Sequence, residues 1–170
     1  DTFEMADAAL IGIVERLETR GQTPEELGRL RRFMTLRVTT LPRIRGLLVY
    51  DRNGNWLTSS LPSTPARTHN ADLGYFQHHL HNTDRASFLG KPIRSRSSGE
   101  WIVTLSRRFD APDGSFSGVV LATLDASYFG DHYSQFDVGE HGAIALMHRD
   151  GTLMARFPDG ASMVGRNLAN

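Results

Sequence analysis

The chain has 170 residues, of which 39% are hydrophobic and 22% charged, a balance typical of a soluble globular protein rather than a disordered one. The 19 Lys and Arg residues equal the 19 Asp and Glu residues, and zero net charge argues against a protein that binds nucleic acid through a basic surface. The sequence has no cysteine, so disulfides and thiolate chemistry are excluded.

The sequence begins at Asp1 rather than at methionine, and no apolar stretch approaches the roughly 20 residues of a membrane span. We therefore expect a piece of a longer protein, with any targeting or membrane segment outside it. Lys91 is the only lysine. Genome composition is the simpler explanation of this bias, although arginine is also the better residue for forked recognition of carboxylates.

Apolar residues at helical spacing predict an amphipathic helix over residues 3–17, which ends at Gly21. A second helix begins at Thr23-Pro24, where Thr23 is the predicted N-cap and Glu26 completes a capping box; Pro42 closes it. The chain therefore opens with a long helical arm.

From residue 44 the period changes to that of strands. Segments 44–50 and 56–60 flank "DRNGN", and the Asn53-Gly54 pair predicts a hairpin. Residues 61–72, rich in Pro, Ser and Thr, predict a loop. A short helix is expected over residues 73–81, capped by Asn70 or Asp72.

Three more strands are predicted at residues 89–96, 100–109 and 116–125, and a short helix at 127–136. The last two strands are joined by "APDG". Helices do not alternate with strands, so we predict an α+β fold with an antiparallel sheet of about five strands. "LLVYDRNGNWLTSS" and "IALMHRDGTLMARF" share one plan, with polar turns at Gly54 and Gly151, and this repeat indicates a second, similar sheet beginning near Gly142.

Enzyme chemistry has little support in the sequence. His78 and His81 are three residues apart on one helical face, a spacing that zinc tolerates, but no third ligand is identifiable. The histidines are therefore interpreted as surface residues. The Gly-x-Ser-x-Gly elbow, phosphate-binding glycine motifs and a calcium-binding loop are absent.

A ligand site has better support. Alternation places Arg94 and Arg96 on one strand face. On the next strand Trp101, Val103 and Leu105 lie opposite Ile102, Thr104 and Ser106, and on the third Leu121, Thr123 and Asp125 share a face. With the aromatic residues Tyr75 and Phe76, such a sheet can hold a small zwitterion or carboxylate. Solvated edge arginines and Asp125 as a helix cap explain the same pattern equally well.

The order of motifs resembles that of the double Cache sensor domains, also called PDC domains. The segments that carry it are the helical arm and then "LPRIRGLLVYDRNGNWLTSS", "DLGYFQHH", "FLGKPIRSRSSGEWIVTLSRRF", "GSFSGVVLATLDASYF" and "GAIALMHRDGTLMARFP". The resemblance implies two PAS-like sheets behind a long N-terminal helix, in the extracytoplasmic part of a bacterial diguanylate cyclase, histidine kinase or chemoreceptor. It implies an arm over residues 1–43, a membrane-distal, ligand-binding subdomain over 44–136, and the start of an incomplete membrane-proximal subdomain over 137–170.

The resemblance also assigns residues. Asp125 matches an aspartate that binds a ligand amine in amino-acid-binding members, and Tyr75 and Phe76 match their aromatic pair. The arginine that clamps the ligand carboxylate falls on Leu73 in this sequence, so Arg94 or Arg96 would have to replace it. The predicted ligand contacts are Asp125, Tyr75, Phe76, Arg94, Arg96, Trp101, Thr104 and Thr123.

We therefore predict a non-enzymatic periplasmic sensor domain of an inner-membrane receptor. It binds an amino acid, carboxylate or amine in the distal sheet and transmits a shift through the N-terminal helix, which also offers a homodimer contact. No cofactor, metal or nucleic acid is expected. The alternative is a ligand-free spacer or dimerisation domain of the same fold, and a small hydrolase or metalloenzyme ranks last.

Overall fold

The computed structural model describes residues 2–95, 98–127, 139–158 and 162–169. By its internal contacts the chain forms two compact units, Asp1–Gly90 with Thr104–Leu124, and Lys91–Val103 with Asp125–Asn170. The predicted boundaries after residues 43 and 136 stay predictions.

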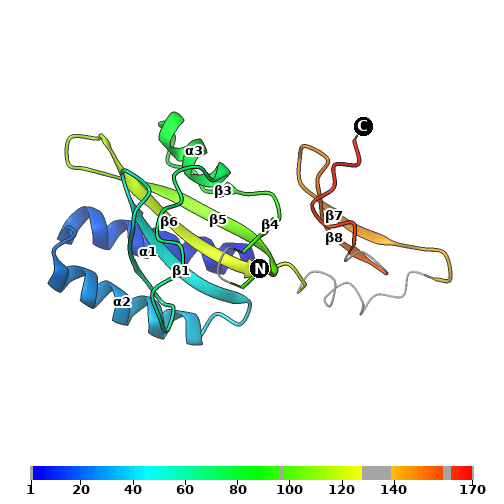
Figure 1. Cartoon of the computed structure of the whole chain (residues 1–170), viewed down its shortest axis with the longest axis horizontal. Coiled ribbons are helices and arrows are strands. Elements are labelled where there is room, and N and C mark those ends of the chain that lie inside the picture. The colour runs from blue at the N-terminus through cyan, green and yellow to red at the C-terminus, as the bar shows by residue number, and fades with distance from the viewer. Residues whose placement is uncertain (1, 96–97, 128–138, 159–161, 170) are drawn as a thin grey trace. The chain divides into compact units, whose positions relative to one another are not determined.

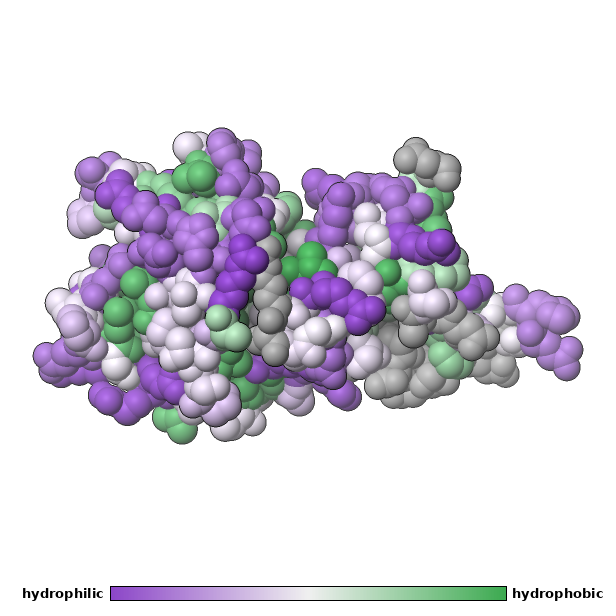
Figure 2. All heavy atoms as spheres, in the orientation of Figure 1, coloured by the Kyte–Doolittle hydropathy of each residue, from purple (hydrophilic) through white to green (hydrophobic). Residues whose placement is uncertain are grey.

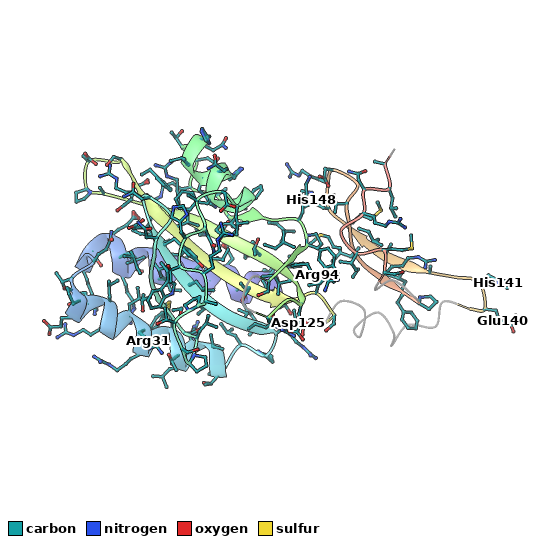
Figure 3. All side chains as sticks on the ribbon, in the orientation of Figure 1. Arg31, Arg94, Asp125, Glu140, His141 and His148 are labelled. Carbon is teal, nitrogen blue, oxygen red and sulfur yellow. The ribbon has the colours of Figure 1, made fainter. Side chains whose placement is uncertain are left out.

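Two helices open the chain, α1 (Thr2–Arg20) and α2 (Pro24–Thr39). The side chain of Thr23 accepts a hydrogen bond from the Glu26 backbone N–H at 3.3 Å and caps α2, with Pro24 as its first residue, so the predicted helix start is confirmed. Farther along α2, Arg31 donates to the carbonyl oxygens of Ser59 at 3.1 Å and Leu61 at 2.8 Å, and these bonds tie the helix to the chain at the end of a strand (Figure 3).

The main sheet is antiparallel, with strand order β2-β1-β6-β5-β3 and β4 paired to β5, so the predicted α+β class is confirmed. Its strands are β1 (Ile44–Asp51), β2 (Trp56–Ser59), β3 (Phe88–Leu89), β4 (Ile93–Arg94), β5 (Trp101–Asp110) and β6 (Phe116–Asp125). The single strand predicted over 89–96 is wrong as a single element, because Gly90, Lys91 and Pro92 interrupt it. Proline has no N–H to give to a sheet ladder.

The sheet separates two apolar clusters in the first unit. On one face α1 and α2 pack against residues such as Leu47, Val49 and Leu105. On the other face α3 (Gly74–His81) packs against the other cluster, which includes Leu48 and Leu121 (Figure 1). Of these residues, the sequence alternation had assigned a strand face to Leu105 and Leu121, and the structure places them in different clusters. The molecular face drawn in Figure 2 is largely hydrophilic, with apolar residues in scattered patches.

The second unit contains the hairpin of β7 (Ile144–Met147) and β8 (Leu153–Phe157). Its turn has a positive φ of 89° at Gly151, as the sequence repeat predicts. Lys91 forms an ion pair with Asp150 at 2.5 Å, and this contact, with the backbone N–H of Thr152, holds the pKa of Asp150 well below its usual range. Apart from Ser127, the helix predicted at 127–136 lies outside the described residues.

Candidate functional site

The candidate site is the face of the main sheet that α3 covers. Tyr75 and Phe76 project inward from this helix and are 3% and 1% exposed. Leu73 is the N-cap, and it makes no side-chain capping bond. The predicted cap by Asn70 or Asp72 is therefore wrong, because the N-cap position falls on Leu73, one residue after Asp72 and three residues after Asn70.

Asn70 instead supports the aromatic residues of this face. Its side-chain Nδ2 donates to the hydroxyl oxygens of Tyr50 at 2.8 Å and Tyr75 at 3.0 Å, and all three residues are buried. The two tyrosine rings lie 6.4 Å apart between centroids. One amide therefore fixes a tyrosine from β1 and a tyrosine from α3 in relation to each other, and three buried polar groups lie together on the α3 side of the sheet.

Phe76 belongs to an aromatic group that continues onto β6. Its ring packs edge-to-face on Phe116, with centroids 5.6 Å apart. The guanidinium of Arg108, on β5, lies 5.2 Å from the centroid of Phe116. These contacts restrict the orientation of the Phe76 ring, since edge-to-face rings and stacked guanidinium groups both favour one geometry over others.

The interpretation of the histidines as surface residues is wrong for His79, which is 0% exposed. Its Nε2 lies 2.9 Å from Ser106 Oγ on β5. Burial, reinforced by the neighbouring His78, lowers the pKa of His79 to about 4, so the ring is neutral at physiological pH. His78 stacks on Phe88 at 3.9 Å and His81 is exposed.

Two buried polar atoms on this side lack a hydrogen-bond partner among the described residues, Nδ1 of His79 and Nε1 of Trp56. Trp56 packs against the same apolar cluster as Tyr75 and Phe76. Buried polar atoms without partners are uncommon in folded proteins, and a bound solute or ordered water is a frequent explanation.

The two predicted threonines occupy different environments. Thr104 is buried on β5, close to Gly90, on the same strand face as Ser106. Thr123 is half-buried, and its hydroxyl donates to the carbonyl of Gly46 at 3.4 Å, a weak bond. Leu121, Thr123 and Asp125 follow the same face of β6, since side chains alternate along a strand.

In the second unit, Arg94 on β4 and Asp125 at the end of β6 lie on the two strands that flank Trp101, the first residue of β5. Arg94 pairs directly with Trp101, and the backbone N–H of Ala126 donates to the carbonyl of Trp101 at 3.3 Å (Figure 3). The Asp125 carboxylate accepts bonds from the backbone N–H of Ser127 at 2.9 Å and its hydroxyl at 2.7 Å.

The Arg94 guanidinium is exposed and lies 4.9 Å from the Trp101 ring, while one of its nitrogens donates to the carbonyl of Gly99 at 2.9 Å. Alternation along β5 places Trp101 and Thr104 on opposite faces of the strand. Arg96 lies outside the described residues. The structure therefore brings Arg94 and Trp101 together as one pair, and Tyr75 and Phe76 together as another.

Among the described residues, no group of three His, Cys, Asp or Glu side chains is placed to hold a metal ion. None of the helices in the same part of the chain has the length and apolarity that a bilayer span needs.

Comparison with solved structures shows the family. Over 99% of its length, the chain matches the extracellular domain of rpHK1S-Z16, described as a histidine kinase, with 35% identity and a TM-score of 0.87. The match covers 68% of that structure. The chain belongs to the double Cache family of extracytoplasmic sensor domains. The double Cache domain is a sensor and not an enzyme.

More distant structures share the fold. The ligand-binding domain of the Pseudomonas fluorescens chemoreceptor CtaA in complex with L-serine matches with a TM-score of 0.75 and 14% identity, over 98% of this chain and 69% of that one. The Pseudomonas aeruginosa PAO1 amino acid chemoreceptor PctC in complex with GABA also gives 0.75, at 17% identity, over 99% and 74%. No protein-family model and no curated protein matches the sequence.

Three residues of the site were missed by sequence reasoning, namely Asn70, His79 and Arg108. Asn70 was considered only as a helix cap. One signal for His79 was present in the sequence, because residues i and i+4 share a helical face and Tyr75, four residues before His79, was already predicted to contact the ligand.

Proposed function

We propose that this double Cache domain senses a small organic solute that carries an amino group, and that the Asp125 carboxylate binds the ammonium. The observation that carries this proposal is the position of Asp125, the last residue of β6, on the strand face shared by Leu121 and Thr123. A carboxylate that accepts charge-assisted hydrogen bonds is the natural partner of an ammonium group.

The related structures support a ligand of this class. CtaA is described with L-serine and PctC with GABA, and both ligands carry an ammonium and a carboxylate. In this chain the N-cap position of α3 is Leu73, which packs against the apolar cluster. The absence of an arginine at this position favours an amine whose recognition does not depend on a carboxylate clamp there.

The other predicted contacts remain part of the proposal. A ligand carboxylate, where present, would be bound by Arg94 or Arg96. Tyr75, Phe76, Thr104 and Thr123 would provide aromatic and hydroxyl contacts. Trp101, which alternation places on the opposite face of β5 from Thr104, would take part only together with its partner Arg94. Tyr75 and Phe76 are the best prepared of these, because Asn70 and Phe116 already hold them in place.

We further propose that this domain is the extracytoplasmic part of a membrane receptor. Segments outside the chain attach it to the inner membrane, and α1 forms a homodimer contact and transmits the ligand-induced shift. The output domain is a cytoplasmic histidine kinase or diguanylate cyclase. A shift of this kind requires the ligand to bind two conformations with different affinities.

A spacer or dimerisation domain that binds no ligand is the second candidate. The packing of Tyr75 and Phe76, which are 3% and 1% exposed, favours it, because the aromatic side chains fill the space beneath α3. On this alternative the unpartnered atoms of Trp56 and His79 are served by water alone.

A thermal-shift screen of the chain against amines, amino acids, short carboxylates and purines tests the proposal, repeated with Asp125→Ala. A ligand at about 100 times its dissociation constant adds roughly 2.7 kcal/mol of stability. We expect an amine-bearing compound to raise the melting temperature of the wild-type chain by several degrees and to leave Asp125→Ala unchanged.

Asp113→Ala is the matched control. The Asp113 carboxylate accepts bonds from the N–H of Ser115 at 2.9 Å and its hydroxyl at 2.6 Å, the same local arrangement that Asp125 makes with Ser127. A hit retained by Asp113→Ala and lost in Asp125→Ala supports the site. Hits retained by both variants would remove Asp125 from it, and a screen without hits on folded protein would favour the spacer.

A further inference from the structure

Arg108 closes the C-terminal end of α3. Its side chain is 5% exposed, and one of its terminal nitrogens donates to the carbonyl oxygens of His79 at 3.3 Å and Asn82 at 2.8 Å. The last carbonyl groups of a helix have no partners within it, and a cation at this end also interacts favourably with the helix dipole. Arg108 therefore fixes where α3 ends relative to β5.

A second contact joins Arg108 to the aromatic side of α3. The guanidinium packs on Phe116, and Phe116 packs edge-to-face on Phe76. Arg108 thus touches the end of α3 directly and its inward-facing Phe76 through one ring. A displacement of α3 cannot leave the Arg108 side chain where it is, because a close-packed interior transmits strain.

Arg108 forms an ion pair with Asp110, and Asp110 is connected to α1 through Arg85 and Glu18. Arg108 donates through Nε to Asp110 Oδ1 at 2.7 Å, and Arg85 donates to Asp110 Oδ2 at 2.9 Å. Arg85 also binds both carboxylate oxygens of Glu18 on α1, and this bond raises the pKa of Arg85. The backbone N–H of Asp110 donates to Glu18 Oε2 at 3.3 Å.

Open space next to Glu18 leaves the C-terminal half of α1 room to move. A cavity of about 380 Å³ adjoins the contact, and Glu18, Arg85 and Arg108 are among the residues that line it. On this side α1 is held by long charged side chains over an open space, whereas its opposite side, with Leu10 and Ile13, is buried in the apolar cluster. Ion pairs of this kind can be exchanged without reopening a packed core.

We propose that Arg108 is a positioning residue for α3, and that the chain Arg108–Asp110–Arg85–Glu18 couples the position of α3 to that of α1. This inference rests on the proposed function, in which the ligand binds beneath α3 and α1 transmits the response. A ligand that shifts α3 changes the carbonyl groups and the Phe76 ring that hold Arg108, and the carboxylate of Asp110 follows. Coupling of this kind is reciprocal, so a change at Glu18 alters the stability of α3.

Hydrogen exchange of the unliganded chain tests the coupling, with Glu18→Gln as the perturbation. We expect amides of α3 to exchange at least about fivefold faster in the variant, the lower end of typical coupling between sites. Amides in the interior of α2, around Leu30 and Met34, should keep their wild-type rates. Arg85→Gln should give the same pattern, and the double variant should add little to either change, since both act through one chain of contacts.

Asp7→Asn is the matched control. The carboxylate of Asp7 receives two bonds from Arg107, at 2.6 and 2.8 Å, so its loss also removes an ion pair between α1 and β5. Among the described residues no hydrogen bond or ion pair joins Asp7 or Arg107 to α3, and Arg107 meets the coupling chain only at the backbone carbonyl of Arg85, at 2.6 Å. Faster exchange of α3 in Glu18→Gln but not in Asp7→Asn supports the coupling.

Equal effects of Glu18→Gln and Asp7→Asn on α3, a uniform rise across all elements, or a change confined to α1 would each overturn the inference. The exchange experiment uses no ligand, so it is separable from the screen. A thermal-shift screen without hits, together with faster hydrogen exchange confined to α3, would refute the proposed function and leave the coupling in place. A confirmed amine ligand with unchanged α3 exchange would support the proposed function and overturn the coupling.

Discussion

Acidification between pH 6.5 and 4 is expected to destabilise this domain through His79. The ring is buried beneath α3, where Ser106 Oγ lies 2.9 Å from Nε2. The titratable and charged groups that face it are His78 on the same helix, Asp84 after it and Arg108 on β5. Burial, the largest cause, lowers the pKa of His79 from 6.5 to about 4. The folded chain therefore resists the proton that the unfolded chain accepts.

The direction of the effect follows from proton binding. Between the two pKa values the unfolded state binds more protons, so the free energy of unfolding rises with pH in this window and is level above it. At pH 5 the two values, 6.5 and about 4, correspond to a loss of about 2 kcal/mol relative to pH 7. The full loss is reached only below pH 4.

Urea unfolding from pH 7 to pH 4.5 measures the effect as a difference between the wild-type chain and His79→Gln. Carboxylates titrate in the same range in both proteins, so subtraction isolates the histidine. We expect the wild-type chain to lose about 2 kcal/mol more than the variant by pH 5. His81→Gln, at an exposed position of the same helix, should follow the wild-type curve. Parallel curves for wild type and His79→Gln would refute the argument that burial keeps this ring neutral.

Three further predictions concern stability and can be checked by chemical denaturation. Gly54→Ala should destabilise the fold by more than about 1 kcal/mol, because φ is +84° and the added carbon would lie 2.6 Å from Ala71, whereas Gly28→Ala, in a helix with open space around it, should stabilise by about 0.5–1 kcal/mol. Thr23→Ala removes the α2 cap and should cost about 1 kcal/mol, whereas Thr23→Ser should cost little. Asn70→Ala leaves two buried tyrosine hydroxyls without their shared donor and should cost roughly 2–4 kcal/mol; an effect below 1 kcal/mol would mean that the bonds contribute little.

Features set by local patterns were predictable from the sequence. The buried stripe of α1, with Leu10, Ile13 and Leu17, repeats every three or four residues, and nothing in the tertiary structure had to be known to read it. The Asn53-Gly54 pair likewise specifies a turn whose backbone suits few other residues, and Gly54 has the expected positive φ.

Features set by competition between nearby side chains were less predictable. Asn70 and Asp72 both have good capping side chains, yet the N-cap position of α3 falls on Leu73, which makes no side-chain capping bond, and the Asn70 amide bonds to Tyr50 and Tyr75. Tyr50 is 20 positions away in the sequence, so no local rule assigns it as a partner of Asn70. Tertiary contacts of this kind override local capping preference.

The structure gives one of the many arginines, Arg108, a role that the lysine-poor composition did not indicate. The near absence of lysine was interpreted as genome composition, and that interpretation gives no arginine a particular role. Around α3 the guanidinium geometry itself is used, because Arg108 binds a carboxylate, two helix carbonyls and an aromatic ring at the same time. A lysine ammonium on a flexible stem is a point charge that cannot make these contacts together. The sequence shows that arginine is available throughout the chain, but only the packing of α3 against β5 identifies Arg108 as the residue whose planar, many-donor side chain determines the position of that helix.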